Sequence, residues 1–232
     1  MKKSLLVLIL TFYFSLLSGQ AQKDNYYLED QIFITATYNL IVNKSDSIRQ
    51  GGFSNGLVVG YVRDIPLNKQ RNFGLGVGIN YSIAHIYQNV SMKSLENGTT
   101  DIQRMESYQY IRNKFSLSFI EMPFEIRYRT STIDKHKFFR FYLGFKIGYR
   151  LRAYSKLKTK INEISYYNQP EFNWWKYAIY LNIGYGSWNF HVDYTLSKVF
   201  KDETFAKPYD SAQSLIPMDM NMLSFGLTFY LI

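Results

Sequence analysis

This chain of 232 residues contains no cysteine and five prolines, and after residue 17 it has no long uninterrupted apolar run. The absence of cysteine excludes a disulfide scaffold, a thiolate metal site and a lipid-acylated N-terminus. The lack of spans of about 20 apolar residues, together with a mean hydropathy of -0.22, argues against a bundle of membrane helices. Because 47% of the residues are nevertheless apolar, the chain is too hydrophobic to be intrinsically disordered.

The N-terminus has the organisation of an export signal. Lys2 and Lys3 precede an apolar run over residues 5–17, and the small residues Ser18, Gly19 and Ala21 follow. This order predicts a secretory signal peptide over residues 1–21, since the apolar run is too short for an alternative membrane anchor. A short periplasmic segment over residues 22–30 and a β-barrel over residues 31–232 are expected to follow.

Past the signal, apolar residues recur at every second position, which is the pattern of a β-strand with one apolar face. The clearest segment sets Phe73, Leu75, Val77 and Ile79 against Gly74, Gly76, Gly78 and Asn80. Eight such segments are predicted, over residues 32–42, 57–61, 73–84, 115–128, 139–152, 172–185, 188–197 and 223–231. The apolar phase changes in the fourth segment, which predicts a β-bulge near Phe119 and Ile120.

The predicted connections are alternately long and short, as in an up-and-down antiparallel barrel with long extracellular loops and short periplasmic turns. Gly186 and Ser187 predict a two-residue hairpin. In a soluble barrel the apolar face would line the interior and the polar face would meet water. Here the polar face is rich in glycine, so the aromatic face is expected to contact lipid. Interfacial aromatic belts are expected at Trp188, Tyr185, Tyr128, Tyr38 and Trp175. The sequence therefore predicts an all-β, eight-stranded transmembrane barrel of the outer membrane.

The export signal ending in SGQAQ and the eight-strand plan resemble the PorT-like outer-membrane β-barrel family. The similarity is carried by YVRDIPLNKQRNFGLGVGINYS, by FIEMPFEIRYRTST and by FFRFYLGFKIGYRLRAYS. It extends over essentially the whole mature chain and is more specific for architecture than for function. One namesake of the family belongs to type IX protein secretion, so the resemblance implies a role in secretion or surface organisation. It transfers no catalytic or ligand-binding residue.

Charged residues on the predicted inner face are the candidate site. If the turn over residues 130–137 is centred, Glu121 lies opposite Lys146 and Arg127 opposite Arg140, with Glu125 diagonal to Arg140. One interpretation is a plug in which these charges satisfy one another, because the interior of an eight-stranded barrel is just filled by side chains. The alternative is a narrow pore that prefers anions. The full predicted network comprises Glu121, Glu125, Arg127, Arg140, Lys146, Arg150, Arg152, His191 and Asp193.

Enzymatic activity is not expected, although a lipid-modifying enzyme is a third hypothesis. His191 and Asp193 share the inner face but lie about 7 Å apart along one strand, which is too far for a hydrogen-bonded triad. His85 is expected on the lipid side, with no serine two residues further on to act as a nucleophile. No metal cluster or nucleotide motif is found in the sequence, so no cofactor is expected.

The excess of positive charge suggests partners at the membrane surface. Lys156, Lys158 and Lys160, with Arg104, Arg112 and Lys114, are expected to contact lipopolysaccharide headgroups or simply to be solvated. The long loop over residues 89–113 is the expected contact for other envelope or secretion proteins. Nucleic acid is not expected as a partner, because the chain is exported and has no nucleic-acid-binding motif.

Overall fold

The computed structural model describes residues 30–95, 100–130, 139–167, 169–209 and 214–231. The predicted signal peptide, most of segment 22–30 and most of the predicted turn over residues 130–137 therefore lie outside the described residues. Within them, the only helical element is a short 3-10 helix, η1 (Ser107–Gln109). No helix in this part of the chain is both long and apolar enough to cross a membrane.

The described chain is built almost entirely from β-strands. The barrel strands are β1 (Gln31–Val42), β2 (Asn55–Pro66), β3 (Phe73–Tyr87), β6 (Arg112–Arg129), β7 (Phe139–Lys158), β9 (Trp175–Tyr185), β10 (Trp188–Thr195) and β13 (Asn221–Leu231). The long connections contain β4 (Val90–Ser94), β5 (Thr100–Arg104), β8 (Glu163–Tyr167), β11 (Phe205–Ala206) and β12 (Ile216–Pro217).

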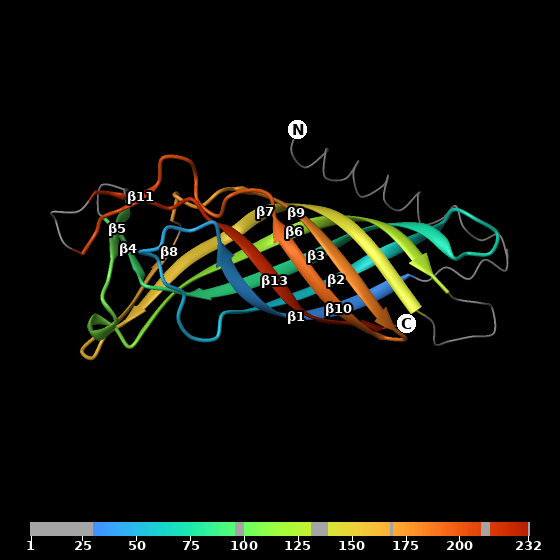
Figure 1. The fold of residues 1–232 in the computed structure, drawn as a ribbon, viewed down its shortest axis with the longest axis horizontal. Coiled ribbons are helices and arrows are strands. Elements are labelled where there is room, and N and C mark those ends of the chain that lie inside the picture. The colour runs from blue at the N-terminus through green and yellow to red at the C-terminus, as the bar shows by residue number, and fades with distance from the viewer. Residues whose placement is uncertain (1–29, 96–99, 131–138, 168, 210–213, 232) are drawn as a thin grey trace, which may run out of the picture.

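The eight barrel strands form a closed antiparallel sheet, as predicted. Their hydrogen-bonded order is β6-β3-β2-β1-β13-β10-β9-β7, and the pairing of β6 with β7 closes the barrel. Ile32 lies opposite Leu231, so the start of β1 and the end of β13 both lie at the end of the barrel that carries the short turns. At the other end β4, β5, β8 and β11 extend beyond the barrel (Figure 1).

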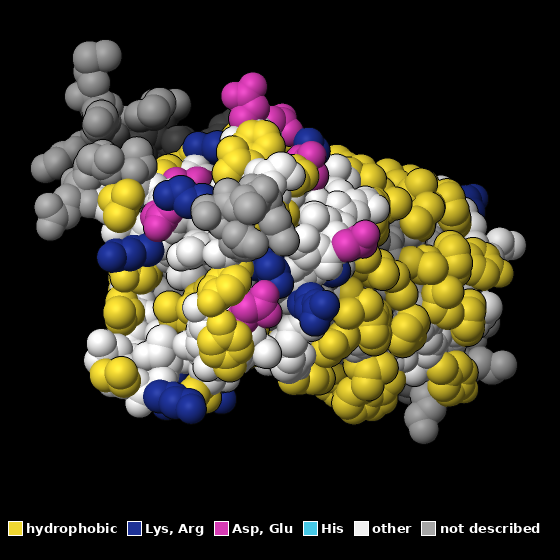
Figure 2. Space-filling model, turned by 60° about the vertical axis from the view of Figure 1, so that its left-hand side comes forward, with side chains coloured by type: hydrophobic (Ala, Val, Ile, Leu, Met, Phe, Trp, Pro, Cys, Tyr) yellow, Lys and Arg dark blue, Asp and Glu magenta, His cyan; other side chains and the backbone are white. Residues whose placement is uncertain are grey.

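Alternation along the strands separates two environments. In β3 the odd positions from Phe73 to Tyr81 are exposed, whereas Gly74, Gly76 and Asn80 are buried. On the face seen in Figure 2, the outward apolar side chains form an apolar belt over the barrel, and charged side chains gather toward the end that carries the long loops. The predicted outer face is thus confirmed in β3. Gly186 opens the predicted two-residue hairpin with a φ of 59°, a backbone region that glycine adopts readily.

The predicted bulge in the fourth segment is wrong in its location. The register between β6 and β7 does shift between Ser118 and Phe119, but the extra residue is Leu151 in β7, because Ser118 pairs with Arg152 and Phe119 with Arg150. Strand β6 therefore keeps its phase throughout. Phe115 and Phe119 point into the barrel, where they are almost completely buried.

Those inward aromatic side chains belong to an apolar plug that fills the half of the barrel nearest the long loops. Phe172 and Phe200 come from two different loops and stack on each other, with ring centroids 4.5 Å apart. Phe115 of β6 packs against both. The prediction that a strand begins at residue 172 was wrong because Phe172 is used in this plug, and β9 begins at Trp175. The other plug residues include Ile48, Ile86, Val90, Met92, Ile102, Met218, Met220 and Met222.

Candidate functional site

The other half of the lumen contains a buried network of charges. Glu121 is fully buried and lies 3.0 Å from Lys176 Nζ and 3.4 Å from Lys146 Nζ. Ser82 donates a third contact, from its hydroxyl to Glu121 Oε1, at 2.9 Å. Lys146 also pairs with Asp193. Two carboxylates and two ammonium groups thus compensate one another where little water reaches them.

A second group of charges lies closer to the short-turn end. Arg127 Nε donates to Glu125 Oε2 at 2.6 Å, and its Nη1 reaches Asp64 Oδ1 at 3.3 Å. Arg129 completes this group with a 2.8 Å bond to the other oxygen of Asp64. Tyr180 donates its hydroxyl hydrogen to Glu125 at 2.7 Å. Both Glu125 oxygens are therefore occupied, so this group fixes a carboxylate in place rather than presenting it to a solute.

The remaining predicted inner residues have separate partners. Arg140 donates to the carbonyl of Gly186 and lies over the ring of Tyr230, 5.6 Å from its centroid. Arg150 donates to the carbonyl of Phe172 at 2.8 Å, which ties the plug to β7. His191 Nδ1 lies 2.7 Å from Asn182 Oδ1. Asp193 pairs with Lys146, whereas the hydrogen-bond partner of His191 is Asn182.

The predicted pairing of these side chains differs from the observed one in register. Glu121 lies opposite Gly148 and Arg127 opposite Tyr142, so the contact between Glu121 and Lys146 is diagonal. Arg140 lies opposite Arg129, and Glu125 is bound by Arg127 rather than placed beside Arg140. Strands β6 and β7 thus pair two positions away from the register that a turn centred over residues 130–137 would give.

Arg152 does not belong to the inner network. The extra residue Leu151 reverses the phase of β7, so Arg152 is exposed on the outer wall and Ala153 is buried in its place. Conversely, sequence reasoning missed Asp64, Arg129, Lys176 and Tyr180. Asp64 and Lys176 occupy inward positions of their strands. Continuing the alternation of residues 57–61 to Asp64, and counting Lys176 on the inner face of residues 172–185, would have found both.

One contact on the outer wall bears on the enzyme hypothesis. His85 Nδ1 lies 2.6 Å from the hydroxyl of Ser116, which the register of β3 and β6 places directly opposite. A base beside a hydroxyl is the first requirement for a serine nucleophile. Ser116 is only 2% exposed, however, so the hydroxyl is not accessible to a lipid ester. The residues that the structure describes also contain no group of three or more His, Asp or Glu that would hold a metal ion.

Comparison with known proteins agrees with this architecture. A family model described as "Outer membrane protein beta-barrel domain" matches residues 20–201. The chain belongs to this outer-membrane β-barrel family. Membership supports an outer-membrane location, so the long-loop end is hereafter called extracellular and the short-turn end periplasmic. The match does not reach the finer PorT-like relationship, and the signal peptide also stays a prediction.

Two solved structures also match the chain. One is Ail, the attachment invasion locus protein of Yersinia pestis, with 13% identity and a TM-score of 0.39 over 87% of this chain and 97% of that chain. A second structure of Ail, in complex with the heparin analogue sucrose octasulfate, matches with 10% identity and a TM-score of 0.31 over the same shares. A search of curated proteins finds no match.

Proposed function

We propose that this barrel is a non-enzymatic, non-conducting anchor that presents its extracellular surface to partners in the cell envelope. The observation that carries the proposal is the filling of the lumen at two levels. The charge network occupies one half and the apolar plug occupies the other. Among the described residues, the cavity lined by Lys146, Lys176, His191 and Asp193 has a volume of about 20 Å³, which is enough for a single water.

The proposal predicts that the purified barrel carries no resolved current in a planar lipid bilayer. The Arg150→Ala variant is also expected to be silent, because Phe115, Phe172 and Phe200 still fill the lumen without that side chain. A wide porin measured in the same bilayers serves as the positive control. An anion-selective current in the wild type that falls in Arg150→Ala would instead support the pore hypothesis.

As a finer proposal, the barrel takes part in protein secretion or surface organisation, as its PorT-like sequence segments suggest. Deleting the gene is expected to alter the proteins found at the cell surface and in the medium, and the wild-type gene should restore them. Quantitative proteomics of both fractions measures this effect. Unchanged fractions together with an intact envelope would remove the secretion role.

A further inference from the structure

The outer wall carries a cluster of positive charge at the extracellular ends of β6 and β7, separate from the lumen. We call it the cationic strip. Its side chains lie on outward positions of the two paired strands, and Arg112 and Arg152 are exposed. Its members are Arg112, Lys114, Arg152, Lys156 and Lys158.

The strand register sets like charges directly against each other in this strip. Arg112 lies opposite Lys158, and Lys114 lies opposite Lys156. Like charges at directly opposed positions destabilise an antiparallel pair. Two successive pairs of this kind need a negatively charged group to offset their repulsion.

An aromatic ring concentrates two of these cations further. Lys114 Nζ and the guanidinium carbon of Arg112 lie 5.7 Å and 5.9 Å from the centroid of the Tyr87 ring. A ring face attracts a cation but carries no net charge, so Tyr87 positions the two groups without neutralising them.

The protein supplies little of the missing negative charge. Glu163 of β8 pairs with Lys156 and, at 3.5 Å, with Lys158. The hydrogen bond from Lys156 lowers the pKa of the Glu163 carboxyl, which keeps it ionised. Within the described ranges, no carboxylate forms an ion pair with Arg112, Lys114 or Arg152. Among the described residues, the one carboxylate that pairs with the strip, Glu163, thus contacts two of its five cations.

Toward the extracellular end, the outer wall changes from apolar to cationic, which is the order of acyl chains and headgroup in an outer-leaflet lipid. The apolar belt reaches Tyr81, Ile120 and Tyr149, and above it come the polar rows that contain Ser118 and Ser116. The opposed cations lie above these rows, at the ends of the strands. The acyl chains and the charged headgroup of a lipid therefore each meet a chemically matching layer.

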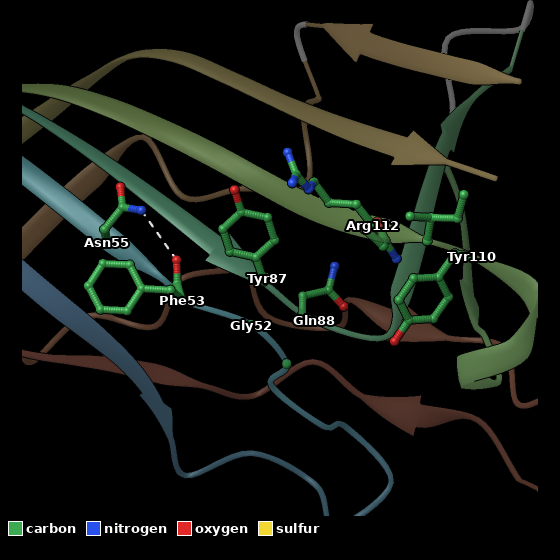
Figure 3. A pocket seen from close by; sticks show the side chains of 10 residues that line it. Gly52, Phe53, Asn55, Tyr87, Gln88, Tyr110 and Arg112 are labelled. Carbon is green, nitrogen blue, oxygen red and sulfur yellow. Dashed lines mark hydrogen bonds between the residues drawn. The ribbon is translucent and has the colours of Figure 1, made fainter. Parts of the chain in front are cut away.

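A cavity of about 400 Å³ opens beside the strip and is lined by Arg112 of the strip and by Tyr87. Figure 3 shows these two side chains between Phe53 on one side and Tyr110 on the other. Asn113 also lines the cavity; it is 2% exposed, and neither its amide nitrogen nor its amide oxygen has a hydrogen-bond partner. Aromatic rings with an unsatisfied amide suit a sugar, which offers both apolar faces and hydroxyl groups.

We propose that the strip and the cavity together bind a phosphorylated glycolipid of the outer leaflet, namely lipopolysaccharide. Its phosphates occupy the cationic strip, a headgroup sugar enters the cavity and the acyl chains lie on the apolar belt. The inference rests on the proposed function, because it requires this face to meet the outer leaflet, and it names one partner of that surface.

The test is a titration of the full chain, purified in a non-ionic detergent at physiological salt, with lipopolysaccharide. The Arg112→Gln/Lys114→Gln variant removes the two cations over Tyr87 that have no ion pair. We expect it to bind lipopolysaccharide about 10- to 100-fold more weakly, because charge-assisted bonds to phosphate are lost. Enzymatically dephosphorylated lipopolysaccharide is expected to bind the wild type more weakly by a similar factor.

The matched control is Lys69→Gln/Lys201→Gln, which removes the same charge from exposed positions away from the strip. It should bind within about twofold of the wild type, and circular dichroism establishes that all variants are folded. Equal binding by the strip variant and the wild type would overturn the proposal. So would equal binding of the dephosphorylated lipid, or of phosphatidylglycerol vesicles, because either shows that no phosphorylated sugar is recognised. The secretion comparison reads out separately, so failure of lipid binding is distinguishable from failure of the proposed function.

Discussion

Replacing Glu121 by alanine is expected to destabilise the barrel by about 3–5 kcal/mol, the usual cost of removing one partner of a buried ion pair. The variant leaves the ammonium groups of Lys146 and Lys176 in the lumen without the carboxylate that contacts both. It also removes the acceptor for the Ser82 hydroxyl. Unfolding in urea from lipid vesicles, followed by tryptophan fluorescence, measures the difference.

Glu163→Ala is a matched control for this prediction. Glu163 also contacts two lysines, but its side chain is 43% exposed, so water replaces the lost contacts and the change is expected to be small. The quadruple variant Glu121→Leu/Lys146→Met/Lys176→Met/Asp193→Leu removes all four charges of this group and is expected to recover most of the lost stability, because apolar side chains of similar volume need no ionic partner. If Glu121→Ala costs no more than Glu163→Ala, the lumenal network does not stabilise the fold.

The second large effect is expected from Gly226→Ala at the seam where β13 meets β1. A β-carbon added to Gly226 would lie 1.9 Å from the carbonyl oxygen of Ala36, a backbone atom of the neighbouring strand. Because a backbone atom cannot rotate away, the two strands must separate or shift, at a cost of roughly 3 kcal/mol. The same urea titration, together with the fraction of barrel that folds, measures the loss.

Gly51→Ala provides the same chemical change at a loop position. A β-carbon there meets no atom within 4 Å, so the expected change is within about 0.5 kcal/mol of zero. Similar stabilities for the Gly226 and Gly51 variants would show that the seam tolerates a side chain, contrary to the close approach in the structure.

The fold could be predicted from sequence because the period-two pattern acts locally along each strand. In β1, β3, β9 and β13 every apolar position expected on the outer face lies there. The pattern is reliable because a register slip of one residue would turn all the apolar side chains of a strand to the opposite face. The change of apolar phase at Phe119 arises because Phe115 and Phe119 point into the plug, and not from a bulge in β6. The alternation alone does not distinguish an aromatic residue that faces lipid from one that packs in a plug.

The site was harder to predict because it depends on register and on loops. A shift of two positions in the register of β6 and β7 changes which side chain faces Glu121. The alternation within each strand does not determine the register between the two strands. One inserted residue, Leu151, moves Arg152 from the lumen to the outer wall and so builds the cationic strip. Phe172 and Phe200 are 28 positions apart, and only the closed barrel brings them together beside Phe115.

Part of the apolar plug comes from the segment that begins the last strand of the barrel. Met220 immediately precedes the last strand and Met222 lies at its start, and both contribute to the plug. The same strand, β13, forms the seam with β1. The lumen is therefore filled completely only when the last strand is in place, so packing of the plug and closure of the seam depend on the same segment of the chain.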